Sequence, residues 1–318
     1  MALNKIYTDE TAARKHLERL LWPEGPFCPH CGNADPKRIH KLQGKSHREG
    51  VYKCRECEKP FSVTVGTAFE SSHVPLHKWV YATHLLTASK KGISSHQLMR
   101  MLGVSYKTAW FMSHRIREGM RPTKLTPMGG GGKIVEIDET ASGRVEGAPK
   151  RARRLMGGFG RTVLTLVERG GSARSFHVEG TTSAQLIPII RANVAKESAV
   201  MTDAASWYKY MNRDGHFVSH DRVDHTNDEY VRREGDKLIT TNTVEGYYSI
   251  FKRGMKGVYQ HCGEKHLHRY LAEFDFRCSN RIALGVDDQA RAEKALQGIT
   301  GKRLTYRRPH GLTQSGAH

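Results

Sequence analysis

Two Cys-x-x-Cys pairs near the amino terminus restrict the fold of this chain more than any other feature of its sequence. Cys28 and Cys31 form the first pair, and Cys54 and Cys57 form the second after a gap of 22 residues. Each pair can present two thiolates from one tight turn, so the two pairs complete a tetrahedral site for one Zn²⁺ ion. Because protein fills all four ligand positions, the expected role of the zinc is structural.

The residues around the cysteines alternate as short strands do. This predicts a zinc ribbon over residues 25–70, behind an N-terminal helix within residues 1–24 that Thr8 or Asp9 caps. Paired cysteines at this spacing favour metal binding in a reducing cytosol over disulfides. Three histidines are expected to be bystanders, namely His30, His40 and His47.

The charge of the chain favours a polyanionic partner. Its 318 residues carry 51 Lys and Arg against 32 Asp and Glu, a formal net charge of +19 and a pI near 9.8. Such a charge attracts nucleic acid. A membrane-surface binder would instead carry a long basic amphipathic helix or a lipidation signal, and neither is present. Because no apolar run reaches signal-peptide or transmembrane length, we expect a cytoplasmic protein with no membrane partner.

Residues 74–122 have helical periodicity and predict a helix-turn-helix region. The pattern indicates a helix over 76–89, a short helix capped at residues 94–95, a Leu102-Gly103-Val104 turn and a longer helix capped by Ser105. Apolar residues line one side of the last helix, namely Ala109, Met112, Ile116 and Met120. An ordinary αα-hairpin has the same pattern and stays open as the alternative.

If this region binds DNA, the first turn of its longer helix faces the major groove. That turn holds Tyr106, Lys107 and Thr108, and we expect Lys107, His114 and Arg115 to lie near phosphates. The zinc ribbon could contact DNA as well, or it could serve as a protein docking module.

A linker at residues 123–133 separates this half from the rest, because prolines and four consecutive glycines exclude a regular element there. The pattern that follows is α/β and defines a domain over residues 134–284. It predicts three strands, a helix, and a strand that pairs beside the first, which is the order of a ribonuclease H-like core with a mixed sheet. The expected strands are 134–138, 158–168, 173–178 and 199–203, with a helix at 183–195.

Residues 207–240 show little periodicity, and a loop of this length indicates either a functional segment or an irregular cover. The next predicted helix, residues 241–259, carries two stripes. The apolar stripe consists of Val244, Tyr248, Phe251 and Met255, and the polar stripe of Asn242, Glu245, Ser249 and Lys252. A further helix is expected at 265–281, followed by a basic tail, 285–318, with little expected order.

Three acids are candidates for a metal site. Asp138, Asp203 and Glu245 stand 65 and 42 positions apart, at predicted strand ends or on a helix that can lie beside those strands. Three oxygen donors suit Mg²⁺ or Mn²⁺, and two such ions form the phosphodiester clamp of nucleases and polymerases. On pattern alone, the acids could equally be unrelated surface charges.

The choice of acid in the first strand is open. Glu136 shares a face with Asp138 by the strand period of two, while Glu139 is expected to point away. Asp138 is preferred because it lies nearer the predicted end of the strand, with Glu136 as the fallback. The rivals of Glu245 lack a helix with an apolar stripe; they are Glu229, Glu234 and Glu264.

Several segments of the chain resemble a known family. IVEIDET, VMTDAASWY, NTVEGYYSIFKRGMKGVY and KHLHRYLAEFDFRCSNR, together with the CPHC start of the ribbon, are similar to bacterial insertion-sequence transposases of the DDE type with an N-terminal zinc ribbon. That lineage also resembles the eukaryotic Merlin transposons. The similarity extends to about Arg281, and the basic insertion at 141–154 departs from the family pattern.

The resemblance implies a role for each matching residue. Asp138, Asp203 and Glu245 would be the catalytic acids that hold two Mg²⁺ or Mn²⁺ ions. Lys252, seven residues after the glutamate, would hold substrate DNA, and His225 is a candidate for substrate contact.

The resemblance also implies a function. Such a protein would bind double-stranded DNA at the terminal inverted repeats of its element, cut it and join it to target DNA. It would act as a homodimer or larger assembly, at the nucleoid of a bacterium. The alternatives are a DNA-binding regulator derived from a transposase, and a related nuclease or junction resolvase without strand transfer.

Overall fold

The computed structural model describes residues 3–143 and 160–305. The chain divides into two compact units. Of the described residues, 3–84, 95–119 and 292–305 form the ribbon unit, and 85–94, 120–143 and 160–291 form the sheet unit. The chain thus enters the sheet unit twice, and its last segment returns to the ribbon unit.

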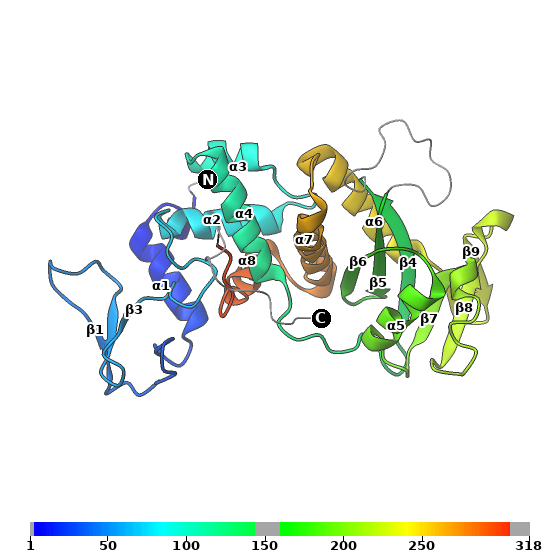
Figure 1. Cartoon of the computed structure of the whole chain (residues 1–318), viewed down its shortest axis with the longest axis horizontal. Coiled ribbons are helices and arrows are strands. Elements are labelled where there is room, and N and C mark those ends of the chain that lie inside the picture. Colours follow the sequence, from blue (N-terminus) through cyan, green and yellow to red (C-terminus); the bar gives the residue numbers. More distant parts are fainter. Residues whose placement is uncertain (1–2, 144–159, 306–318) are drawn as a thin grey trace. The chain divides into compact units, whose positions relative to one another are not determined.

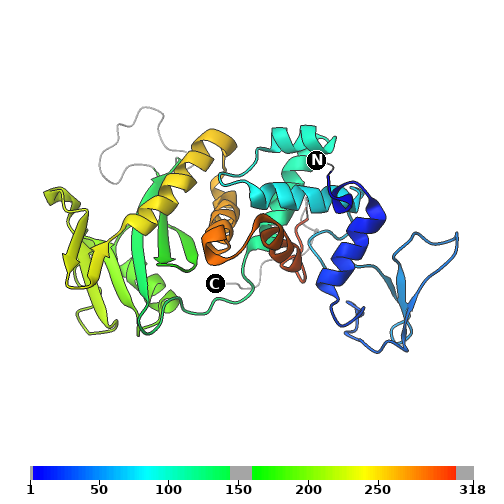
Figure 2. The same cartoon turned by 180° about the vertical axis from the view of Figure 1, so that it is seen from behind.

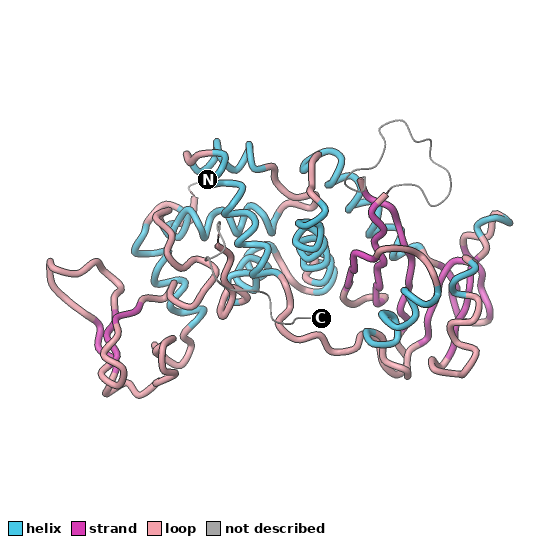
Figure 3. Tube along the Cα trace, viewed as in Figure 1, coloured by secondary structure: helices cyan, strands magenta, loops and turns pink. Residues whose placement is uncertain are grey.

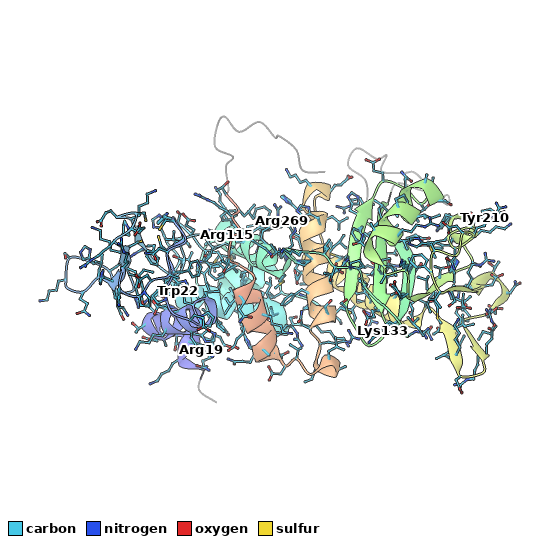
Figure 4. The ribbon with its side chains drawn as sticks, turned by 90° about the horizontal axis from the view of Figure 1, so that it is seen from below. Arg19, Trp22, Arg115, Lys133, Tyr210 and Arg269 are labelled. Carbon is cyan, nitrogen blue, oxygen red and sulfur yellow. The ribbon has the colours of Figure 1, made fainter. Side chains whose placement is uncertain are left out.

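The ribbon unit begins with helix α1 (Glu10–Leu21), whose predicted cap is confirmed because Asp9 accepts a hydrogen bond from the amide of Ala12 at 2.7 Å. Strands β1 (Ile39–Lys41), β2 (Tyr52–Cys54) and β3 (Pro60–Phe61) follow as an antiparallel sheet. Trp22, labelled in Figure 4, packs edge-on against Tyr52 and Phe61 with ring centroids 5.3 and 5.9 Å away. This aromatic cluster joins the end of α1 to the ribbon.

Three helices follow the ribbon: α2 (Leu76–Ala88), α3 (Ser95–Leu102) and α4 (Tyr106–Met120). The predicted cap of α4 is confirmed, since Ser105 Oγ accepts from the amide of Thr108 at 3.1 Å. The turn before it needs Gly103, whose φ of 59° is left-handed. The four predicted apolar residues of α4 are all buried, at 0 to 3% exposure.

Helix α8 (Asp288–Gln297) lies where the sequence predicted a tail with little order. That expectation was wrong up to residue 302. Ala295, Leu296 and Ile299 are buried, and the amide of Ala68 donates to the carbonyl of Ile299 at 2.9 Å. The error arose because few apolar side chains, several of them small, anchor this otherwise polar segment, so its periodic signal is weak. Residues 306–318 lie outside the described residues.

The sheet unit is built on a five-stranded mixed sheet in the order β6-β5-β4-β7-β8 (Figure 1). β4 pairs antiparallel with β5 and parallel with β7. The strand that follows the helix at 183–193 thus lies beside the strand that begins at residue 134, as predicted. Their bounds are β4 (Ile134–Ser142), β5 (Arg161–Glu168), β6 (Ala173–Val178), β7 (Ala199–Asp203) and β8 (Ser219–Val223).

The prediction of an irregular segment at 207–240 was wrong. It contains β8, which extends the sheet in parallel with β7, and the hairpin of β9 (Val231–Glu234) and β10 (Lys237–Thr240), drawn as magenta strands in Figure 3. These strands are short and rich in charged residues, so their period of two is hard to detect. Short helical turns occur at 5–7, 206–208, 225–227, 255–259, 264–266 and 282–284.

Helices cover both faces of the sheet. α5 (Ser183–Asn193) packs on one face through Leu186 and Ile190. α6 (Asn242–Gly254) and α7 (Leu267–Ser279) pack on the other, against Val163 and Val167 of β5. Figure 2 shows α6 lying across the sheet. The apolar stripe predicted for α6 is therefore confirmed as core, which leaves its polar stripe on the outer side.

The predicted linker is partly docked onto the sheet unit. Met128 is buried in the core beneath α5, and its amide donates to the carbonyl of Asn193 at 2.8 Å. Residues 144–159, which contain most of the basic insertion, lie outside the described residues. Every helix in the described ranges is too short or too polar to cross a bilayer.

Candidate active site and zinc-ribbon cysteines

The pairing of β4 and β7 places the two predicted aspartates at the same position along these neighbouring strands. These parallel strands stay in register from Ile134–Ala199 to Glu136–Met201. Two residues further along each strand, Asp138 lies opposite Asp203, where the ladder between the strands has ended. β4 itself continues beside β5 to Ser142, so Asp138 lies within its strand rather than at its end as predicted.

Three carboxylates converge at this point. Oxygens of Asp138, Glu139 and Asp203 lie within 4.8 Å of one another. The expectation that Glu139 points away was therefore wrong. Glu139 reaches the cluster because β4 has separated from β7 at its level, and its carboxylate accepts a hydrogen bond from the hydroxyl of the buried Tyr208. The sequence signal for Glu139 was an acid directly after Asp138.

The carboxylates of the cluster resist ionisation in the absence of a cation. Burial, followed by the charges of Glu139 and Asp203, raises the pKa of Asp138 from 3.8 to about 8. Burial also raises the pKa of Glu139 to about 7, although the hydrogen bond from Tyr208 works against the shift. The pKa of Asp203 is raised by burial too, against the amide of Ala205 and the charge of His225. A divalent cation would relieve this repulsion.

Glu245 stands apart from the three-acid cluster, although it lies close enough for its charge to raise the pKa of Asp138. Its side chain is 44% exposed, and its Oε1 lies 2.9 Å from the donating hydroxyl of Thr241 and 3.4 Å from Nε2 of His225. The tyrosine hydroxyl of Tyr248, on the same helix, donates to the carbonyl of Asp138 at 2.6 Å. α6 is thus tied to β4 at the level of the cluster.

Glu136, the fallback for Asp138, is excluded as a metal ligand by its surroundings. Its side chain is fully buried, and its carboxylate accepts hydrogen bonds from the amides of Thr243 and Val244, the hydroxyl of Thr243 and the guanidinium of Arg169. With both oxygens occupied by these donors, Glu136 cannot turn toward the aspartates.

Of the residues predicted to contact DNA in the sheet unit, Lys252 lies on α6 and His225 lies near the start of that helix. Lys252 is exposed, with its ammonium 5.8 Å from the ring centroid of Tyr248. His225 stacks against Tyr230 at 5.1 Å, and its Nε2 lies 3.3 Å from the hydroxyl oxygen of Thr241. His225 also lies near Glu245, and its charge works against the raised pKa of Asp203.

The residues predicted at the DNA-facing side of α4 divide into two groups. Tyr106 and Lys107 are exposed in the first turn of the helix. Arg115, labelled in Figure 4, is only 6% exposed, donates to the carbonyl of Glu70 and lies 5.3 Å from the ring centroid of Trp79. His114 is buried as well. The prediction that Arg115 and His114 lie near phosphates was wrong, because both belong to the core side of α4.

In the ribbon unit, the four predicted cysteines come together. The Sγ atoms of Cys28, Cys31, Cys54 and Cys57 lie within 4.8 Å of one another, and no histidine of the described residues joins them. Cys28 and Cys54 are fully buried. Four thiolates at this spacing fit the tetrahedral coordination of Zn²⁺ and leave no position for water. The cluster of oxygens in the sheet unit instead fits a hard cation such as Mg²⁺ or Mn²⁺.

Comparison with known proteins identifies both parts of the chain. Residues 8–60 match the transposase zinc-ribbon domain, and residues 129–279 match the ISXO2-like transposase domain, which contains the three-acid cluster and α6. The chain therefore contains a transposase zinc-ribbon domain and an ISXO2-like transposase domain. The first match covers the Cys₄ cluster, and the second covers the three-acid cluster.

An uncharacterized protein in the transposable element ISH50 of Halobacterium salinarum is 28% identical over 289 residues, which cover 86% of this chain and 92% of the relative. Two structures of the Mos1 transposase are similar in part. A pre-cleavage transpososome is 11% identical, covering 65% of this chain and 71% of the other at a TM-score of 0.23. A strand transfer complex is 12% identical, covering 71% and 79% at 0.24. TM-scores this low do not establish a common fold.

Proposed function

We propose that this protein is a DNA transposase that binds the terminal inverted repeats of its element and catalyses metal-dependent strand cleavage and strand transfer. The observation that carries the proposal is the convergence of Asp138 and Asp203, from distant parts of the sequence, inside an ISXO2-like transposase domain. The mixed sheet, with β7 beside β4, supports a ribonuclease H-like arrangement for this chemistry.

Asp138, Asp203 and Glu245 would hold two Mg²⁺ or Mn²⁺ ions, with Glu139 as a further oxygen donor beside them. Such ions supply activation of an attacking oxygen and stabilisation of a leaving oxygen in an in-line displacement. Tyr208 holds Glu139 through a hydrogen bond, and Tyr248 ties α6 to the backbone of Asp138. Lys252, exposed on the same helix as Glu245, would contact a phosphate of the substrate strand, and His225 would contact DNA beside it.

The ribbon unit would recognise the ends of the element. The α3–turn–α4 arrangement would place the exposed first turn of α4, with Tyr106 and Lys107, in the major groove. The zinc ribbon would contribute further contacts to DNA. Transposition requires two element ends to be held together, so we propose a homodimer or larger assembly on DNA, at the nucleoid.

The proposal is tested by incubating the purified protein and Mg²⁺ with a DNA end that bears its candidate repeat. Cleavage and joining to target DNA are expected for the wild type, and a loss of about 1,000-fold or more, on the order of 4 kcal/mol, for Asp138→Asn and for Glu245→Gln. Unchanged activity in both variants would refute the assignment of the site. Binding without cleavage by the wild type would favour a DNA-binding regulator, and cleavage without joining a nuclease or resolvase.

DNA recognition by α4 is tested separately with two cationic residues of that helix. Lys107→Ala should weaken end binding and reduce the dependence of log affinity on log salt by about one phosphate contact. Arg115→Ala should instead lower the thermal stability of the ribbon unit, because it removes a buried side chain from the core. Equal loss of binding for Lys107→Ala and an exposed lysine elsewhere, such as Lys196, would contradict the helix-turn-helix assignment.

A further inference from the structure

The acidic member of a buried ion pair lies two residues before Asp138 on β4. Glu136 and Arg169 meet at 2.5 Å between Oε1 and Nε, with side-chain exposures of 0% and 21%. Burying a carboxylate is costly unless several donors compensate for its lost hydration. An apolar residue at this position of β4 would pack at lower cost. The contacts of the two side chains show what offsets this cost.

Glu136 connects the strand of Asp138 to the helix of Glu245. It lies two residues before Asp138, and its Oε2 accepts from the amides of Thr243 and Val244 at 2.7 and 3.0 Å. Its Oε1 accepts from the hydroxyl of Thr243 at 2.8 Å. These amides belong to the first turn of α6, where helix N–H groups lack partners within the helix and attract a negative charge. The carboxylate thus fixes where α6 begins.

Arg169 extends the same connection to the other strands. Its guanidinium donates to the carbonyls of Leu238 and Thr240, at 2.7 and 2.9 Å, and so holds the end of β10 that leads into α6. It also lies 3.0 Å from the sulfur of Met201, two residues before Asp203 on β7. Together, the two side chains contact all three elements that carry the proposed metal ligands.

We propose that the Glu136–Arg169 pair is a positioning device that sets the place of Glu245 relative to Asp138 and Asp203. This inference rests on the proposed function, since it assumes that these three acids hold the metal ions. Glu245 is exposed and lies outside the three-acid cluster, so its own contacts do not fix its distance from the aspartates. A rigid connection between β4 and the first turn of α6 supplies that constraint.

The test is a double-mutant cycle on Mn²⁺ affinity, measured without DNA by electron paramagnetic resonance. Glu136→Gln and Glu245→Gln should each weaken Mn²⁺ binding, by about 10-fold or more. Because Glu136 acts through Glu245, the double variant should be no weaker than the weaker single variant. An unchanged affinity in Glu136→Gln, or losses that multiply in the double variant, would overturn the proposal. If Glu136→Gln does not fold, Glu136→Asp takes its place in the cycle, because it keeps the negative charge but has a shorter side chain.

Hydrogen exchange of the first turn of α6 gives a second measurement. The amides of Thr243 and Val244 should exchange at least about tenfold faster in Glu136→Gln than in the wild type. Glu273→Gln is the matched control, because Glu273 is also fully buried in an ion pair, with Arg277, but lies away from the carboxylates. It should leave both Mn²⁺ affinity and these two amides unchanged. If the wild type binds no Mn²⁺, the metal site of the proposed function fails, and unchanged exchange in Glu136→Gln would then refute the positioning role as well.

Discussion

The two ligand clusters of this chain differ in how they are assembled. The four cysteines come from one stretch of 30 residues and are identical donors that complete their own coordination shell. The three-acid cluster of Asp138, Glu139 and Asp203 joins strands 65 positions apart, and each acid has different neighbours. Tyr208 binds Glu139, and an amide binds Asp203.

The difference shows what each cluster is suited to do. A closed set of four thiolates saturates its ion, so it contributes to folding and has no position left for chemistry. The carboxylates are held close although their pKa values are raised, which costs stability. Such a cost is expected at a site that must take up cations and act on a substrate.

Cys54→Ser should abolish stoichiometric zinc binding, because removing one of four thiolates leaves the site incomplete and a structural zinc contributes about 10 to 16 kcal/mol of apparent binding free energy. Element analysis should find close to one zinc per wild-type chain and almost none in the variant. Mn²⁺ affinity of the sheet unit should be unchanged. Cys278→Ser, outside the ribbon, is the control, and an equal zinc loss in that variant would contradict the Cys₄ assignment.

Mn²⁺ affinity of the carboxylates should rise with pH. Below its pKa of about 8, Asp138 holds a proton that a metal must displace, and Glu139 behaves likewise below about 7. Apparent affinity should therefore increase by roughly 500-fold between about pH 6 and pH 8 and level off above about pH 9. Titration calorimetry in buffers of different ionisation enthalpy would also detect the released protons. An affinity that is constant over this range would show that the carboxylates are already ionised.

Asp138→Asn should stabilise the zinc-loaded protein in buffer without Mg²⁺ or Mn²⁺. The folded pKa of Asp138 is raised from 3.8 to about 8, so the folded state holds a proton that the unfolded state releases, and stability falls as the pH rises between these values. The asparagine cannot ionise, so the variant does not lose stability in this way. Its Tm at neutral pH should exceed the wild-type value by about 3 °C or more.

Added Mn²⁺ provides the matching control for Asp138→Asn. It should raise the Tm of the wild type by mass action and that of the variant much less, which reduces or reverses the difference between them. A variant that is less stable than the wild type without Mn²⁺ would contradict the repulsion inferred for the cluster.

Tyr208→Phe should have the smallest effect. It removes the hydroxyl that donates to Glu139 without changing the packing of the ring. A lost hydrogen bond to a charged group costs about 1.5 kcal/mol, or roughly tenfold in Mn²⁺ affinity at most. Tyr210→Phe is the control, because Tyr210 is 61% exposed and its hydroxyl lies outside the cluster. Equal effects of the two variants would show that Glu139 is not a ligand.

Much of the local structure could be predicted from the sequence. The Asp9 and Ser105 caps, the buried stripe of α4 and the apolar stripe of α6 depend on neighbours within one or two helical turns, so their pattern is visible in the residues. Elements anchored by few apolar residues were missed, among them β8 and α8. The burial of Arg115 was missed too, since a charged residue on α4 was expected to face outward.

The sequence by itself determined the Cys₄ cluster, because all four ligands lie within two local turns and need no distant partner. It also selected Asp138 and Asp203. Only the tertiary structure decided between the neighbouring acids of β4. Glu136 is bound to the first turn of α6 and Glu139 is drawn into the cluster, and both outcomes depend on where β4 stops pairing with β7. A strand period of two assigns faces, but it cannot say which elements cover them.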